Sequence, residues 1–356
     1  MFFNVAASKA AVIVKALAIT LLCATVLLYS AECADGAVDG LTFCLNVLVP
    51  SLFPFMAIAS FIVNSSIAQT IGKPFSKITR AVFGLNDSFA PVILLSMIGG
   101  YPVGAQAVAS LYKNNLASRA ECEKAALFAV CAGPGFLVNF VGISLYNSKT
   151  IGLILLFSQM LSVILIGILI RFAYRRKSGN TFDRAVKFKT MPLSNAIVQS
   201  AFDSSKGMLM ICSFVVLFSA FTGIINSFLS DSDTKDFILI FLEVCSAVNE
   251  VSADKPIELI AFAAGFGGLC VHFQIYSALG KVKVSKLLFF CTRIIQGTVT
   301  ALLTHFGLIM FTDKQQVFST AAVQSADFFG GTVISGVVLL GISICFLYTI
   351  KNFKQN

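Results

Sequence analysis

Long apolar runs, separated by short polar or charged segments, recur along the whole chain. They cover residues 8–31, 41–67, 125–147, 151–170, 207–228, 257–280, 287–311 and 328–350. A helix that crosses a bilayer needs about 20 mainly apolar residues, and most of these runs are long enough. The pattern therefore predicts an all-α, polytopic membrane protein. We interpret the first run as an uncleaved transmembrane helix, with a cleaved signal peptide as the alternative.

Glycine and proline interrupt the apolar sequence in an octet from Gly99 to Gln106, which reads Gly-Gly-Tyr-Pro-Val-Gly-Ala-Gln. Such a segment cannot form a regular helix, because proline lacks an amide donor and glycine loosens the backbone. In lipid, unpaired backbone groups are tolerated only inside the protein or along a wet cavity. A second octet, Gly267 to Gln274, repeats Gly, Gly, Val and Gln in the same register. Matching interruptions in two halves of a chain predict a transporter-like binding site.

The predicted site uses freed backbone amides and helix N-termini, both of which attract a carboxylate. The substrate-binding residues predicted from the two octets are Gly99, Gly100, Tyr101, Pro102, Gly104, Gln106, Gly267, Gly268, His272 and Gln274. As alternatives, the glycines allow close helix packing and the glutamines bond neighbouring helices. For His272, a structural hydrogen bond is the alternative to a proton relay or ligand contact.

Proline also interrupts the run 41–67, which is either a kinked span or a re-entrant hairpin with Ser51 at its tip. An alignment of the two halves places Ser213 at the equivalent position. Gly133, followed by proline, marks a further break. We therefore add Ser51, Ser213 and Gly133 to the predicted substrate-binding residues.

Two charged residues lie within apolar sequence, where ionisable groups are costly and usually functional. Glu243 lies in the segment 237–249, which is too short to span a bilayer alone. It is predicted to carry a coupling proton, to bind a cation, or to pair with Arg293, with an interfacial position as the alternative. Arg293 is predicted to contact an anionic ligand, unless its side chain extends to the cytoplasmic surface.

The composition supports the membrane interpretation and excludes several other classes. The chain is 57% hydrophobic and 12% charged, with a mean hydropathy of +0.88 and a net charge of +9. Seven basic residues against one acid between Arg171 and Lys189 indicate a cytoplasmic loop, not a nucleic-acid site. Ten cysteines without a Cys-x-x-Cys pair suggest neither a metal site nor disulfides. There is no Walker A or hydrolase motif, so we expect neither an enzyme nor a cofactor.

Three short motifs in order resemble the YlbJ-like sporulation integral membrane proteins, a stage V sporulation family with nucleoside-recognition (Gate) domains. They are Ser51-Leu-Phe-Pro-Phe55, Gly99-Gly-Tyr-Pro-Val-Gly-Ala105 and Phe266-Gly-Gly-Leu-Cys-Val-His-Phe-Gln274. The resemblance covers roughly residues 38–350, and the family is similar in layout to concentrative nucleoside transporters. Family members often carry an Asn/Ser-rich element where this chain has Cys131 to Phe136, so only the backbone break at Gly133 carries over.

The resemblance implies two inverted structural repeats, each with a re-entrant hairpin and a broken helix around a midplane site. The expected domains are an N-terminal transmembrane helix (1–37), a Gate-like repeat (38–173), a basic cytoplasmic loop (174–196) and a second Gate-like repeat (197–356). The implied function is secondary transport or facilitated passage of a small, anionic, dipicolinate-like solute. The alternatives are a nucleoside transporter and a non-transporting sporulation scaffold.

The same resemblance implies a place in the bacterial cell membrane or the outer forespore membrane. The expected partners are a small-molecule solute, the lipid bilayer and a coupling ion, H⁺ or Na⁺; a homo-oligomer is left open.

Overall fold

The computed structural model describes residues 2–65, 67–174, 192–229, 233–251 and 255–311. All of them belong to one compact unit, Met1–Lys314. The described part of the chain is helical and contains no β-strand. The predicted span at 328–350 and most of the predicted basic loop lie outside the described residues.

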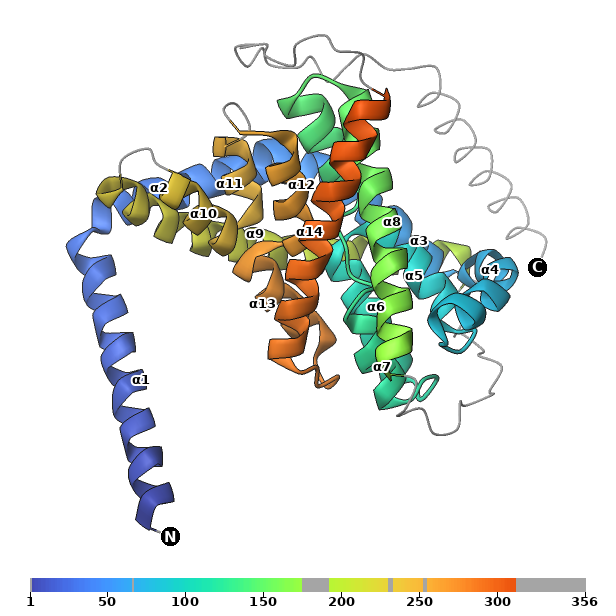
Figure 1. The fold of residues 1–356 in the computed structure, drawn as a ribbon, viewed down its shortest axis with the longest axis horizontal. Helices are drawn as coiled ribbons and strands as arrows, with labels where there is room; N and C mark the ends of the chain where they lie inside the picture. The colour runs from blue at the N-terminus through green and yellow to red at the C-terminus, as the bar shows by residue number, and fades with distance from the viewer. Residues whose placement is uncertain (1, 66, 175–191, 230–232, 252–254, 312–356) are drawn as a thin grey trace. The chain divides into compact units, whose positions relative to one another are not determined.

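The described residues form a succession of helices (Figure 1). In order they are α1 (Phe2–Leu28), α2 (Ser30–Phe43), the π-helix η1 (Cys44–Leu48), α3 (Val49–Asn64), α4 (Ile67–Phe83), α5 (Phe89–Gly99), α6 (Tyr101–Lys113), α7 (Arg119–Ala126), the π-helix η2 (Gly135–Leu145), α8 (Lys149–Tyr174), α9 (Leu193–Phe228), α10 (Asp233–Leu242), α11 (Val244–Val251), α12 (Ile257–Phe266), α13 (Gly268–Leu279) and α14 (Lys286–Phe311).

Five helical segments of the described chain are long and apolar enough to cross a membrane, which confirms the predicted multi-pass class. They are Ser30–Ile62, Lys149–Tyr174, Leu193–Phe228, Ile257–Leu279 and Lys286–Phe311. On α8, large apolar side chains at a spacing of four residues, including Phe157, Leu161 and Leu165, are exposed. A stripe of this kind costs nothing when it faces lipid, whereas in water it would be a large unprotected patch.

The segment around Ser51 is part of a continuous helical run, because α2, η1 and α3 follow without a break. The π-helical turn of η1 accommodates an extra residue, and Pro54 lies inside α3. Of the two alternatives, the kinked span is therefore correct, and Ser51 does not lie at a hairpin tip. Ser213 likewise lies inside α9. The helix α2 also runs across residue 37, where a boundary between domains was expected.

The chain folds back at Gly100 instead. Gly100 has φ +80°, a conformation that favours glycine, and it separates α5 from α6. A Cβ added to Gly104 would lie 2.6 Å from the Cβ of Ser96, so the two helices cross at close range. Near their other ends, Asn86 donates a hydrogen bond to the carbonyl oxygen of Leu116 (3.4 Å). We name this pair the α5–α6 hairpin.

The short segment around Glu243 forms a second fold-back, which we name the α10–α11 hairpin. Ion pairs close its open end, with Lys235 bound to Glu250 (2.8 Å) and Lys255 bound to Asp233 (2.5 Å). Its tip is at Glu243, whose carboxylate accepts a hydrogen bond from the amide of Cys245 (2.9 Å). This carboxylate therefore caps the N-terminus of α11.

The second octet has a different geometry from the first. Gly267 and Gly268, with φ +86° and +66°, interrupt the candidate span Ile257–Leu279 between α12 and α13. The predicted breaks at Gly100 and Gly267 are thus both present. The prediction that the two octets have equivalent structures is wrong. One is a hairpin tip, and the other is an interruption within a span.

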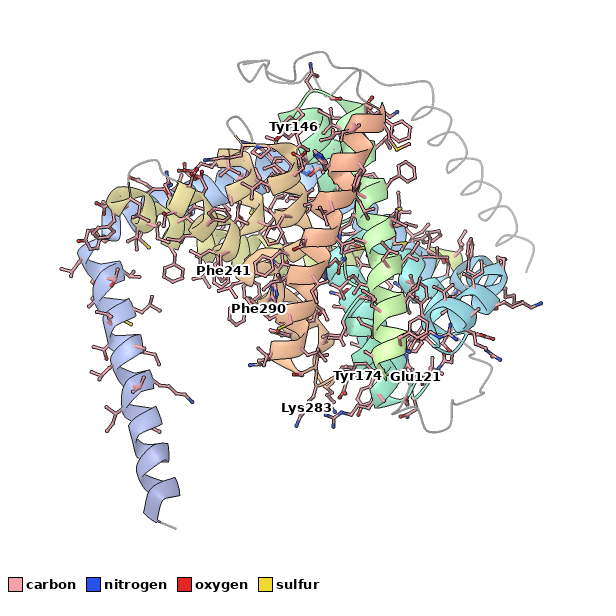
Figure 2. The ribbon with its side chains drawn as sticks, viewed as in Figure 1. Glu121, Tyr146, Tyr174, Phe241, Lys283 and Phe290 are labelled. Atoms are coloured by element: carbon pink, nitrogen blue, oxygen red, sulfur yellow. The ribbon has the colours of Figure 1, made fainter. Side chains whose placement is uncertain are left out.

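The two hairpins open toward opposite ends of the described fold. Figure 2 shows Glu121, Tyr174 and Lys283 at one end and Tyr146 at the other. We call the first the basic end, because Lys281, Lys283 and Lys286 lie in its connections. The α5–α6 hairpin opens there, since Gly84 contacts Lys124 and Arg171. The α10–α11 hairpin opens at the other end, where Glu258, just after it, pairs with His305 near the end of α14 (2.8 Å).

Candidate functional site

One cavity of about 40 Å³ lies where the two halves of the chain meet. Six of the predicted site residues line it: Gly99, Gly100, Tyr101, Pro102, Gly133 and Gln274. Sequence reasoning missed the other lining residues, which are Leu52, Met56, Phe136, Ile211, Val244, Cys245 and Val271. They are apolar residues among many similar ones, so no signal in the sequence distinguishes them.

The cavity is small compared with known ligand sites. A volume of about 40 Å³ holds a few water molecules. Pockets for small-molecule ligands usually measure about 300–1,000 Å³. The cavity of the described structure is therefore much smaller than a usual ligand pocket.

Each hairpin tip lies against the interrupted backbone of a neighbouring segment. A Cβ added to Gly133 would lie 2.9 Å from the amide nitrogen of Gly100, which leaves no space for a side chain. A Cβ added to Gly268 would lie 3.0 Å from the carbonyl oxygen of Ile240 and 3.3 Å from the amide nitrogen of Glu243. Glycine is required at both contacts because backbone approaches backbone.

Arg293 connects these elements across the two halves. It is fully buried and donates hydrogen bonds to the carbonyl oxygens of Val130 and Gly265, the latter at 2.8 Å. The hydroxyl of Tyr101 donates to the carbonyl oxygen of Ala264. The last carbonyls of α12, which have no intrahelical partner, are thus bound by a cation and a hydroxyl.

This arrangement corrects two expectations for Arg293. Its side chain does not extend to the cytoplasmic surface, because it is 0% exposed. Its guanidinium group donates hydrogen bonds to the carbonyl oxygens of Val130 and Gly265, and not to Glu243. Arg293 lies beside Tyr101 behind the cavity, where it supports the cavity wall without lining it.

Several other predicted residues pack close to the cavity without lining it. His272 is buried among the rings of Phe266, Phe289 and Phe290, with its Nδ1 2.5 Å from the carbonyl oxygen of Gly268. Among the described residues, its Nε2 has no hydrogen-bond partner. Gly267 lies against the Tyr101 ring.

Other candidates lie elsewhere. Ser51 is buried, but its hydroxyl donates to the carbonyl oxygen of Val47 in its own helix (2.6 Å). Ser213 is exposed and bonds Leu209 O (2.8 Å). Gly104 lies where α5 and α6 cross, and its lack of a side chain allows their close approach. Gln106 faces Gly207 of α9, at 3.7 Å from a Cβ added there.

The helices α8 and α14 lie side by side (Figure 1). Buried polar residues line the contact between them, and the sequence analysis did not predict this polar seam. The hydroxyl of Thr300 lies 2.8 Å from the carbonyl oxygen of Gln296, 2.9 Å from the hydroxyl of Ser162 and 3.3 Å from Oε1 of Gln159. Thr300, Ser162 and Gln159 are almost fully buried. In the described part of the chain, both amide atoms of Gln296 lack a hydrogen-bond partner. The signal available in the sequence was polar residues, such as Gln159, within otherwise apolar runs.

Within the described residues, no group of three His, Cys, Asp or Glu side chains is placed to hold a metal ion. Chemically, the site offers the carboxamide of Gln274 and backbone groups at helix starts in mainly apolar surroundings, while the hydroxyl of Tyr101 is already bonded to the carbonyl oxygen of Ala264. Such groups suit binding and orientation of a polar solute.

The apolar spans with exposed stripes, and the interrupted helices buried between them, define a multi-pass integral membrane protein. Comparison with known proteins agrees. The chain is 23% identical over 325 residues to the sporulation integral membrane protein YlbJ of Bacillus subtilis (strain 168), covering 79% of this chain and 78% of that protein. The expected resemblance to YlbJ-like proteins is therefore confirmed. No family model matches the chain, and no solved structure does so either.

Proposed function

We propose that this protein is a secondary transporter or facilitator for a small anionic solute, with dipicolinate as the candidate cargo. The observation that carries the proposal is the shared cavity. It is lined by the tip of the α5–α6 hairpin and by Val244, Cys245, Val271 and Gln274 from the second half of the chain. Interrupted helices that converge from two halves on one cavity are typical of secondary transporters.

The order of elements supports two inverted repeats with re-entrant hairpins. In the first, the α5–α6 hairpin is followed by the interrupted pair α7 and η2, and then by α8. In the second, the α10–α11 hairpin is followed by the interrupted pair α12 and α13, and then by α14. Because the hairpins open toward opposite ends, each would enter the membrane from a different side.

Helix N-termini at the cavity favour an anionic cargo. Tyr101 begins α6 and Val244 begins α11, and both line the cavity. The free amides at the start of a helix attract negative charge. In the described structure, the amide of Cys245 already donates a hydrogen bond to the carboxylate of Glu243.

Glu243 would then act as the coupling residue. Its carboxylate competes with a solute carboxylate for the start of α11. Protonation of Glu243 would weaken its own cap, free that amide for the solute, and couple uptake to a proton gradient.

Uptake into proteoliposomes tests the proposal directly. Full-length protein would be reconstituted and supplied with labelled dipicolinate or labelled uridine, with and without an inward proton gradient. Saturable dipicolinate uptake above protein-free vesicles supports the anion transporter. Uptake of uridine alone would support the nucleoside alternative, and no uptake of either would contradict the transport proposal.

A second candidate is a non-transporting membrane scaffold used in sporulation, because the name of the relative gives a sporulation role and a place in the membrane. Under this alternative, Gln106→Ala and Gln274→Ala would leave cellular function intact, whereas changes in exposed loops would abolish it.

A further inference from the structure

The helix α4, which precedes the α5–α6 hairpin, has three different faces. Thr79 and Phe83 are buried against the protein. Lys73, Lys77 and Arg80, at a spacing of four and three residues, form an exposed basic face. Residues three and four apart lie on the same side of a helix.

The third face of α4 is apolar and exposed. Phe75 is 41% exposed and Ile78 is 52% exposed, and both lie away from the basic side chains around the helix. A helix with opposed basic and apolar faces is typical of the membrane–water interface, where the apolar side enters the acyl region.

The position of α4 in the fold agrees with a place at the membrane–water interface. Its last turn leads to Gly84, which lies beside Arg171 in the last turn of α8. The span Lys149–Tyr174 ends there, so α4 meets the protein where a membrane-crossing helix leaves the bilayer.

A second pair of cations extends the basic face of α4. A Cβ added to Gly84 would lie 3.4 Å from both Lys124 Nζ and Arg171 Cγ. Lys124 is only 9% exposed, and its Nζ reaches one acceptor, the carbonyl oxygen of Gly84, at 3.5 Å. Burial and, secondly, the positive charge of Arg171 lower the pKa of Lys124. Two neighbouring cations with so few acceptors favour an added anion.

Two of the acids nearby are engaged in ion pairs, Asp87 with Arg80 (3.2 Å) and Glu123 with Arg119 (2.6 Å). Glu121 caps α7 through its Oε2, while its buried Oε1 has no hydrogen-bond partner among the described residues. Among the described residues, no ion pair involves the remaining cations, which are Lys73, Lys77, Lys124 and Arg171.

We propose that the basic face of α4, together with Lys124 and Arg171, binds the headgroups of anionic phospholipids, while Phe75 and Ile78 enter the acyl region. Juxtamembrane basic residues gain about 1 kcal/mol each near an anionic surface. The surface is separate from the cavity, so the inference does not depend on the proposed cargo.

A single tryptophan can report this binding, because the chain contains none. Phe75→Trp would be placed in vesicles of phosphatidylcholine and phosphatidylglycerol, with bromine, a quencher, carried by one lipid or the other. We expect brominated phosphatidylglycerol to quench the fluorescence more than its share of the lipid predicts. Quenching in proportion to composition, or no quenching by either lipid, would overturn the proposal.

Charge variants identify the residues responsible. Each lysine should contribute about a fivefold preference for phosphatidylglycerol over phosphatidylcholine. The double variant Lys73→Gln with Lys77→Gln should therefore lose the preference, and the single variant Arg171→Gln should keep part of it. The matched control, Lys281→Gln with Lys283→Gln, removes the same charge from another loop at the basic end and should keep the preference. Added inorganic phosphate should have no effect, because the site requires a lipid. Loss of preference in the control, or competition by phosphate, would contradict a specific lipid surface.

Discussion

The guanidinium group of Arg293 donates a hydrogen bond to the carbonyl oxygen of Val130, and this contact joins the second half of the chain to the first. The same group binds Gly265 O at the end of α12 (2.8 Å). One buried side chain therefore satisfies carbonyls from two interrupted helices, which in lipid would otherwise remain unpaired at considerable cost.

Removing this guanidinium should destabilise the fold. Arg293→Met leaves two buried carbonyl groups without their donor, each worth about 1.5–3 kcal/mol for a bond to a charged group. Thermal unfolding in detergent should show a clearly lower midpoint. Arg80→Met is the control, because Arg80 is exposed and its pair with Asp87 contributes little. Equal midpoints for the two variants would contradict the joining role.

The contact between Gly133 and Gly100 allows no side chain. Gly133→Ala should push the α5–α6 hairpin away from the interrupted segment, because its Cβ would lie 2.9 Å from a backbone nitrogen. We expect lost uptake in proteoliposomes and reduced stability. Gly307→Ala is a control with the same added methyl group, which would lie 2.8 Å from a methyl group of the Ile154 side chain and near no backbone atom, so a side-chain rotation can relieve the contact. Normal uptake by the Gly133 variant would show that the tip contact is not needed.

Gln274 provides the carboxamide at the cavity, so its removal should affect the solute and not the fold. Gln274→Ala should raise the KM for uptake about tenfold, the value of one lost hydrogen bond at the upper end of the usual range. The unfolding midpoint should change little. Gln199→Ala, on the exposed face of α9, should leave uptake unchanged. An unchanged KM for the Gln274 variant would exclude this residue from the site.

The cap formed by Glu243 on α11 leads to a prediction about coupling. Glu243→Gln cannot release or take up a proton, so uptake should persist without its dependence on the proton gradient. The comparison is Glu250→Gln, at the open end of the same hairpin, which should keep that dependence. If the Glu243 variant responds to the gradient as the unchanged protein does, the coupling proton is carried elsewhere.

The opposite openings of the two hairpins predict the sidedness of the loops. In a background without the partly or fully exposed Cys23, Cys33, Cys212 and Cys291, a cysteine introduced at Lys283 should react with an impermeant maleimide from one side of the membrane only. A cysteine introduced at Asp233 should react from the other side. Labelling of both from the same side would rule out inverted repeats.

The sequence by itself determined the class of protein and the positions of its interruptions. Apolar runs of spanning length require a membrane, and the glycines at 100 and 267 cannot sustain a helix, so both results follow from local chemistry. The same reasoning left open whether Ser51 lies in a kinked span or at a hairpin tip, and the structure shows that the helix continues through Pro54 with a π-helical turn before it.

Only the tertiary structure decided what each interruption does. The two octets are alike in sequence, yet Gly100 reverses the chain and Gly267 interrupts a span, because their packing partners differ. From the sequence, Arg293 could have extended to the cytoplasmic surface, bound an anionic ligand or paired with Glu243, whereas in the structure it donates to the carbonyls of Val130 and Gly265. These outcomes depend on contacts between residues that are far apart in the sequence. Patterns of neighbouring residues do not specify such contacts.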